Sequence, residues 1–164
     1  MAPEAELQAA CCDLVADVVR TSGKVQLKVA GLSMIPFLWP GDIVTVRHCD
    51  PSELQTNWII VLRQRERLIV HRFLYWAGDS VVTRGDARPR CDEPARATEV
   101  LGQVECILRN GRRISLGSSL WKGATASLLR RSEWCTWLFL RLSCRVRRFD
   151  AAETTLGPIH SDTP

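Results

Sequence analysis

The feature that most constrains the fold of this chain is a series of short apolar segments separated by turn-forming residues. In residues 24–30, Val25, Leu27 and Val29 alternate with polar residues, which is the pattern of a strand with one buried face. Glycine or asparagine stands between several of the later segments, as tight turns require. The sequence therefore predicts a mainly β domain, with strands at 24–30, 43–47, 59–63, 68–75, 80–84 and 99–108.

Segments with helical spacing occur on both sides of these strands. Residues 4–21 place apolar residues near a 3.6-residue period, and Gly23 follows as a stop signal. These apolar residues are Leu7, Cys11, Leu14, Val15, Val18 and Val19. Residues 119–148 combine leucine and tryptophan with arginine, as interfacial helices do. We expect an N-terminal helix packed on the core over 1–23, a β domain over 24–116, a basic amphipathic helical extension over 117–148, and a disordered tail over 149–164.

Length and composition fit a single globular domain. The chain has 164 residues, of which 46% are hydrophobic and 24% are charged, so one core can form. Its net charge of +4 is uneven, because residues 109–148 contain ten Lys or Arg and one acid, Glu133. Two interpretations stay open for residues 119–148: contact with an anionic membrane surface, or a solvated outer helix face. A nucleic-acid partner is not expected, since no segment resembles a nucleic-acid-binding fold.

The cysteines and the N-terminal residues bear on the compartment. Of the seven cysteines, Cys11 and Cys12 are adjacent and the other five are scattered. They form neither a Cys-x-x-Cys pair nor a cysteine–histidine cluster with zinc spacing. Free thiols favour a reducing compartment. Acids interrupt residues 1–20, and no run of about 18 apolar residues follows, so neither a signal peptide nor a membrane span is expected. We therefore expect a cytoplasmic protein, with peripheral attachment to a membrane as the alternative.

The candidate functional residues are Ser33, His71, Asp86 and Asp92. Serine, histidine and aspartate are the side chains that together make a hydroxyl nucleophilic, and they occur here in that order. Each also has a plain structural interpretation, as a turn serine, a half-buried histidine or a turn aspartate. His71 lies in a predicted strand, which would hold an imidazole base rigidly. His48 ends another strand, and we rank it below His71 as a candidate base.

The motifs around these residues resemble a known family. Most bacterial members of that family pair the serine with a lysine, but no lysine lies between Lys28 and Lys122. The chain is instead similar to members with a histidine at that place. The resemblance is to the type I signal peptidases of the endoplasmic-reticulum and archaeal branch, within the group that includes LexA-like repressors, and it rests on Ser33-Met34-Ile35-Pro36, Gly41-Asp42, Val70-His71-Arg72 and Thr83-Arg84-Gly85-Asp86 with Asp92.

This resemblance implies a LexA-like antiparallel β-barrel-like core with an N-terminal and a C-terminal helix. It implies a serine endopeptidase in which Ser33 is the nucleophile, His71 the general base, Asp92 the third triad residue and Asp86 a supporting acid. The substrate would be a peptide or protein, and no cofactor is implied. Gly31, Met34 and Pro36 would lie at the oxyanion or substrate site. Gly31 stands where some relatives carry a serine, so a second oxyanion donor must come from elsewhere.

Two other functions stay open beside the endopeptidase. One is a binding module for a peptide or protein that keeps the same fold without catalysis. The other is a self-cleaving regulator, although the first 23 residues are too few for a DNA-binding domain. The apolar residues that follow Ser33 could form a substrate-facing rim or part of the core; these are Ile35, Phe37, Leu38 and Trp39.

Overall fold

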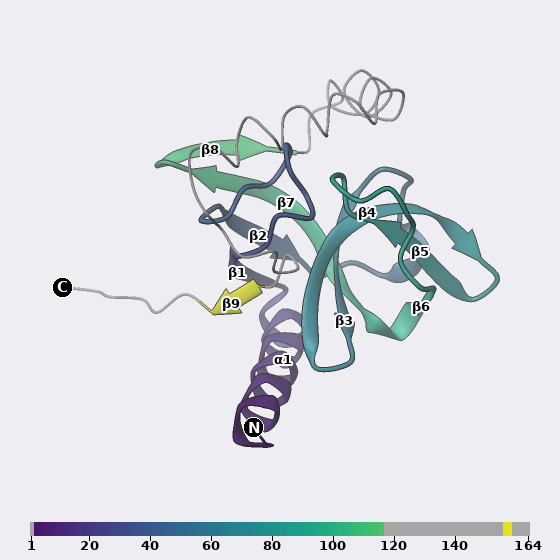
Figure 1. Cartoon of the computed structure of the whole chain (residues 1–164), viewed down its shortest axis with the longest axis horizontal. Helices are drawn as coiled ribbons and strands as arrows, with labels where there is room; N and C mark the ends of the chain where they lie inside the picture. Colours follow the sequence, from purple (N-terminus) through teal and green to yellow (C-terminus); the bar gives the residue numbers. More distant parts are fainter. Residues whose placement is uncertain (1, 117–155, 159–164) are drawn as a thin grey trace.

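Nine strands form one antiparallel sheet in the part of the chain that the structure describes, residues 2–116 and 156–158 (Figure 1). The structure is a computed structural model, and its described part also contains one α-helix, α1 (Ala2–Ser22). The strands are β1 (Lys24–Val29), β2 (Ile43–Arg47), β3 (Ile59–Gln64), β4 (Arg67–Ala77), β5 (Ser80–Arg84), β6 (Ala95–Arg96), β7 (Val100–Arg109), β8 (Arg112–Ser115) and β9 (Leu156–Pro158), with 3-10 turns at Pro51–Glu53 and Ala97–Glu99.

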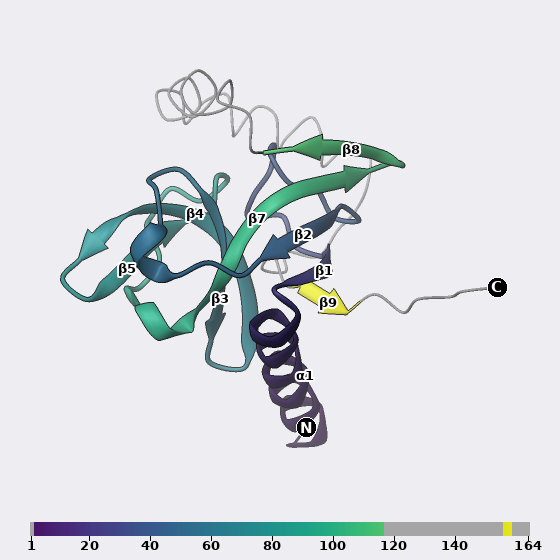
Figure 2. The same ribbon diagram turned by 180° about the vertical axis from the view of Figure 1, so that it is seen from behind.

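The β7 strand links the two halves of the sheet (Figure 2). Its first half pairs with β3, where Gly102 is opposite Val61. Its second half pairs with β2, where Leu108 is opposite Ile43, and with β8 on the other edge. The ladders to β2 and β3 each contain a register shift, which bends the strand between its partners.

The sheet is curved but does not close. Its strands follow the order β6-β5-β4-β3-β7-β2-β1-β9, with β8 paired to β7. The expected barrel-like core is therefore corrected to an open antiparallel sheet. The physical reason is that β9 pairs only with β1 and lies against β4 without sharing a ladder with it.

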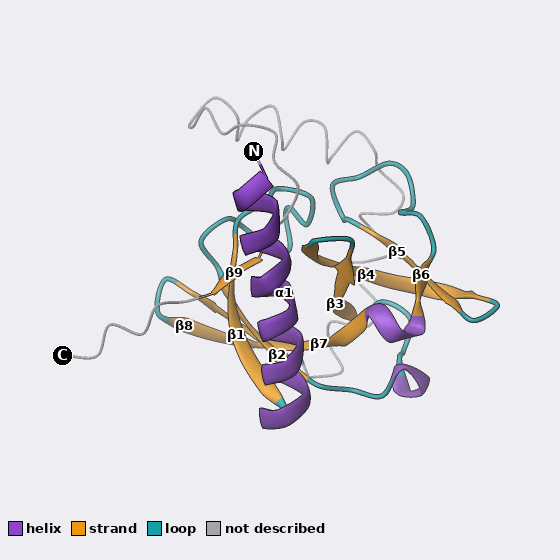
Figure 3. Ribbon diagram, turned by 90° about the horizontal axis from the view of Figure 1, so that it is seen from below, coloured by secondary structure: helices purple, strands orange, loops and turns teal. Residues whose placement is uncertain are grey.

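Two clusters of buried side chains hold the sheet together. The first lies between α1 and the strands β1, β4 and β7, against which the helix packs (Figure 3). The second contains Ile60, Leu62 and Phe73. Because side chains alternate across a strand, β3 contributes Ile59 and Val61 to the first cluster and Ile60 and Leu62 to the second. β3 is thus buried on both faces.

The buried face of α1 agrees in part with the expected one. Val15 and Val19 are buried as expected, whereas Leu7 and Leu14 are exposed, at 67% and 64% of their surface. The residues that pack on the sheet lie at a spacing of three or four along the helix, which is also a helical period. They are Cys12, Val15, Ala16 and Val19. Within the described residues, no helix has both the length and the apolar character needed to cross a membrane.

The expected turns form, and three residues of the expected tail form a strand. Asn57 has a φ of 75°, and the β7–β8 hairpin turns through Asn110 and Gly111 at φ values of 49° and 75°. Asparagine and glycine tolerate this left-handed region. Residues 156–158, within the tail expected to be disordered, form β9. The predicted helical extension over 117–148 lies outside the described residues.

The position of Gly102 yields a stability prediction. A methyl group there would clash with the backbone carbonyl of Arg47, because β7 passes closely at the point where it changes partners. We expect Gly102→Ala to lower the free energy of unfolding by about 3 kcal/mol, as severe overpacking does. Urea denaturation measures this. Gln103→Ala, at the half-buried neighbouring position, is the control and should change stability much less. Equal stability of the two variants would contradict the close approach.

Candidate active site

The loop between β1 and β2 carries Ser33 and is fixed at both ends. Where the loop leaves β1, the N–H of Val29 donates to the carbonyl of Asp42 and its carbonyl accepts from the N–H of Gly41, both at 2.8 Å. Inside the loop, the N–H of Leu38 donates to the carbonyl of Met34 at 2.9 Å. Ser33 is therefore held by backbone bonds on either side of it.

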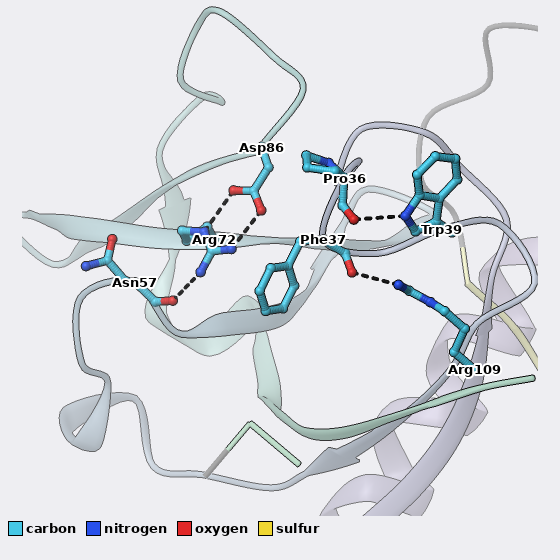
Figure 4. Close-up of polar contacts among 7 residues, drawn as sticks. All are labelled: Pro36, Phe37, Trp39, Asn57, Arg72, Asp86 and Arg109. Atoms are coloured by element: carbon cyan, nitrogen blue, oxygen red, sulfur yellow. Dashed lines mark hydrogen bonds and ion pairs between the residues drawn. The ribbon is translucent and has the colours of Figure 1, made fainter. Parts of the chain in front are cut away.

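A distant arginine braces the same loop. Arg109, at the end of β7, donates from Nε and Nη2 to the carboxylate of Asp42 at 2.8 and 2.6 Å. Its Nη2 also donates to the carbonyl of Phe37 at 2.8 Å (Figure 4). The buried carboxylate also accepts the N–H of Trp39 at 2.8 Å. The Trp39 indole donates to the carbonyl of Pro36 at 2.9 Å. A buried carboxylate with this many donors stabilises one loop conformation.

Ser33, His71 and Asp92 lie in hydrogen-bonding sequence. The hydroxyl oxygen of Ser33 is 2.8 Å from Nε2 of His71, and Nδ1 of His71 is 2.6 Å from Oδ2 of Asp92. An ionised carboxylate can only accept, so Nδ1 carries the hydrogen and Nε2 is left to accept from the serine hydroxyl. This is the arrangement in which an imidazole can remove a proton from a hydroxyl. Ser33 and His71 are both buried, at 6% and 4% exposed.

Asp92 is itself held by β5. Its Oδ2 accepts a second hydrogen bond from the hydroxyl of Thr83 at 2.7 Å, and its N–H donates to the carbonyl of Thr83 at 2.8 Å. Burial opposes ionisation of Asp92, but hydrogen bonds from His71 and Thr83 and the charge of Arg88 outweigh it, so its pKa is lowered. The carboxylate is thus kept ionised beside the imidazole.

The segment after β5 packs directly on the serine. The N–H of Ala87 donates to the carbonyl of Ser33 at 2.8 Å. A methyl group on Gly85 would stand 2.6 Å from that carbonyl oxygen and 3.0 Å from Nε2 of His71. Only a residue without a side chain therefore allows Ser33 and His71 to approach each other here.

Asp86 pairs with an arginine, whereas Asp92 contacts His71. Its two carboxylate oxygens accept from Nε and Nη2 of Arg72 at 2.8 and 2.7 Å, the geometry of a bidentate pair (Figure 4). Arg72 also donates to the carbonyl of Asn57 at 2.8 Å and lies 5.0 Å from the ring centre of Phe37. Because Arg72 follows His71 on β4, this pair ties the Asp86 loop to the strand that carries the imidazole.

The other predicted site residues lie around Ser33 with different exposure. Gly31 is buried, and Pro36 is half-buried. Met34 is completely buried in the first core cluster, so its side chain packs inward rather than toward a substrate. Of the four apolar residues that follow, Ile35 and Leu38 are buried and Phe37 and Trp39 are half-buried. The segment is thus core at two positions and partly accessible at the other two.

His48, the rejected alternative base, is occupied elsewhere. Its Nδ1 is 3.1 Å from the carbonyl of Leu101. Within residues 2–116 and 156–158, no cluster of histidine, cysteine, aspartate and glutamate is arranged to hold a metal ion.

A cavity of about 1080 Å³ opens beside the imidazole and the carboxylate. Its wall consists of the β3–β4 turn and the segment before β6, and Ser33 is not part of it. The lining residues are Gln64, Arg65, Glu66, Arg67, Ile69, His71, Arg88, Pro89, Arg90, Cys91, Asp92 and Glu93.

Three residues of the site were not assigned a role from the sequence. Thr83 and Gly85 stand within a quoted motif, but nothing in the sequence indicates that they contact Asp92 and Ser33. Arg109 is 67 positions from Asp42 in the sequence. Its neighbouring residues do not distinguish it from an arginine that simply faces solvent. Comparison with known proteins adds no assignment, because no protein-family model matches the chain and no curated protein matches it significantly.

Gly85 provides a test of the site geometry. We expect Gly85→Ala to separate Ser33 from His71 and to lower the free energy of unfolding by about 1–3 kcal/mol, because the new methyl meets backbone. Nitrogen-15 NMR of the His71 ring measures the lost contact, and urea denaturation measures the stability. Arg90→Ala, at an exposed position in the same loop, is the control and should alter neither. An unchanged His71 spectrum in Gly85→Ala would contradict the packing.

The lowered pKa of Asp92 predicts a pH-dependent contribution to stability. A carboxylate with a depressed folded-state pKa stabilises the fold above its unfolded pKa of about 3.9, and loses this effect as the pH falls through the folded-state value. We expect wild type to exceed Asp92→Asn in stability above about pH 5, and the gap to shrink below about pH 4. Urea denaturation from pH 2 to pH 7 measures the gap. Glu93→Gln, at an exposed position, should show no such gap.

Proposed function

We propose that this chain is a serine endopeptidase of the signal peptidase type. The observation that carries the proposal is the sequence of contacts from Ser33 through His71 to Asp92, at 2.8 and 2.6 Å. The resemblance of the surrounding motifs to histidine-containing signal peptidases supports the same conclusion. The mainly β fold is compatible with it but does not by itself define a function.

In the proposed reaction, the Ser33 oxygen attacks the carbonyl carbon of a peptide bond while its proton passes to Nε2 of His71. Asp92 keeps the imidazole oriented and stabilises its positive charge. The tetrahedral intermediate expels the amine, which takes the proton from His71 and leaves an acyl group on Ser33. Water then attacks the ester with His71 again as the base, which frees the acid and restores the serine. No cofactor takes part in this scheme.

Stabilisation of the oxyanion is the least complete part of the scheme. We assign one donor to the backbone N–H of Ser33, and the side chain at position 31, a glycine, offers no second donor. Loss of one such donor typically costs about 3 kcal/mol of transition-state stabilisation. A slow enzyme is the consequence unless another group of the site donates to the oxyanion.

A non-catalytic module that binds a peptide is the second candidate. The observation in its favour is the burial of both reacting groups, since Ser33 and His71 are 6% and 4% exposed. The two functions differ in their response to Ser33→Ala, which should abolish cleavage by an enzyme and leave peptide binding by a module unchanged. Contact between residues 119–148 and an anionic membrane stays a prediction, because those residues lie outside the described part.

Mutation of the three central residues tests the proposal. We expect Ser33→Ala and His71→Ala to lower kcat/KM by about 10⁴- to 10⁶-fold, and Asp92→Asn by about 10⁴-fold through the wrong imidazole tautomer. Cleavage is measured on a quenched fluorescent peptide library rich in small residues, and labelling of Ser33 by a fluorophosphonate is measured in parallel. His48→Gln is the control, and its activity should equal that of wild type. Activity that survives Ser33→Ala would refute the scheme.

A further inference from the structure

The outer edge of β1 leads directly to the nucleophile. The N–H and carbonyl of Val29 both point to the β2 side, where they bond to Asp42 and Gly41. In an antiparallel strand the backbone groups of neighbouring residues point to opposite edges. The N–H and carbonyl groups of Lys28 therefore face the outer edge, and Ser33 follows Lys28 by five positions.

Such an edge is a template for an extended peptide. A sheet edge with outward-facing N–H and carbonyl groups pairs readily with another strand, and peptide-binding domains use this mode of recognition. Here the strand ends four residues before Ser33. A peptide paired with Lys28 would thus run along the part of the chain that leads to Ser33.

In this chain, β9 takes that edge. It pairs with β1 in antiparallel register, with Pro158 opposite Leu27, Gly157 opposite Lys28 and Leu156 opposite Val29 (Figure 1). The strand β9 is the last in the order of the sheet, and it also lies against β4, the strand that carries His71. The segment thus contacts both β1, which leads into the loop with Ser33, and β4, which carries His71.

The residues of β9 match this register. Because the backbone groups of Lys28 face outward, the pair Lys28 and Gly157 is the one in which facing groups can bond. Pro158 lacks an N–H but stands opposite Leu27, whose backbone groups face the β2 side, so the missing donor costs nothing. A proline one position earlier would remove a donor that faces β1.

The direction of β9 decides what it can do. In the antiparallel register, Leu156 is the β9 residue opposite Val29, the end of β1 that leads to Ser33 four positions later. The strand then runs away from the serine toward Pro158. β9 therefore covers the approach to the reacting groups rather than the hydroxyl itself, which is consistent with a role as a blocking strand.

We propose that β9 is an internal strand that occupies the peptide-binding edge of β1, so that the chain is self-occluded and an extended peptide binds by replacing β9. The inference rests on the proposed function for the identity of the ligand, a peptide substrate. The burial of Ser33 and His71 accords with a closed state of this kind. The occupant is residues 156–158 of the same chain, not a second molecule.

Binding of a peptide copy of the segment tests the occlusion. The probe is a fluorescein-labelled peptide with the sequence of residues 153–159, Glu-Thr-Thr-Leu-Gly-Pro-Ile. All variants are made in the 164-residue chain and carry Ser33→Ala to exclude turnover. The test variant adds Gly157→Pro, which should release β9. The matched control adds Ser161→Pro, outside β9. Because apparent affinity scales with the fraction of open edge, we expect Gly157→Pro to lower the Kd at least about tenfold and Ser161→Pro to leave it unchanged. Equal Kd values in the two variants, or no binding to either, would overturn the proposal.

Amide exchange tests the same contact without any ligand. The N–H of Lys28 faces β9, whereas the N–H of Val29 donates to Asp42 within the domain. We expect Gly157→Pro to speed exchange at Lys28 by at least about tenfold while exchange at Val29 stays slow, which also shows that the variant is folded. Unchanged exchange at Lys28 would overturn the proposal.

Turnover separates this inference from the proposed function. With Ser33 intact, we expect Gly157→Pro to cleave the fluorescent peptide library at least about tenfold faster than Ser161→Pro. If both variants cleave at the same rate, the occlusion is refuted and the peptidase function stands. If neither cleaves while peptide binding and Lys28 exchange respond as expected, the peptidase function is refuted and the occluded peptide edge stands.

Discussion

The contact of Gly85 and Ala87 with Ser33 is the constraint on which the rest of the site depends. A side chain at Gly85 would collide with the Ser33 carbonyl and approach the His71 ring, and the N–H of Ala87 bonds to that same carbonyl. The backbone of residues 85–87, after β5, thus packs directly against the loop that carries Ser33. Since the same segment continues to Asp92, one stretch of chain both packs against Ser33 and supplies the carboxylate that contacts His71. The spacing of serine, imidazole and carboxylate follows from this single packing.

Two bidentate ion pairs hold the elements that meet there. Arg72 joins Asp86 to β4, and Arg109 joins Asp42 to the end of β7. Both pairs are largely removed from solvent, and each arginine also donates to a backbone carbonyl. Removal of either carboxylate would leave a guanidinium without its charge partner, which costs more than the pair itself contributes. The ion pairs therefore act mainly to specify one loop arrangement, and the two apolar clusters supply the bulk of the stability.

Local sequence patterns predict the strands, their turns and the N-terminal helix, because alternation and positive-φ residues such as Asn57 depend on neighbouring residues alone. The helix face was predicted only in part. Val15 and Val19 are buried as expected, but Leu7 and Leu14 are exposed, because only tertiary packing selects among apolar residues spread around the helix. The candidates Ser33, His71 and Asp92 could be named from motifs. No local pattern encodes contacts between distant segments. Such contacts bring the three side chains together, and they include the hydrogen bond from Thr83 to Asp92 and the ion pair of Arg109 with Asp42. Barrel closure failed as an expectation for a related reason: β9 comes from a polar tail and pairs on one side only.

The side chains of the candidate site are in hydrogen-bonding contact, but they are poorly accessible from solvent. Ser33, His71 and Asp92 already lie at hydrogen-bonding distances, so they need no rearrangement among themselves. Ser33 and His71 are nevertheless buried, and the adjoining strand edge is already paired. Under the proposed function, a peptide would reach them only after a movement of the chain. The smallest element whose departure would expose the β1 edge is β9, because it is three residues long and joins the sheet through one ladder. Release of so short a strand is compatible with an unchanged triad, since none of the hydrogen bonds that join Ser33, His71 and Asp92 passes through it.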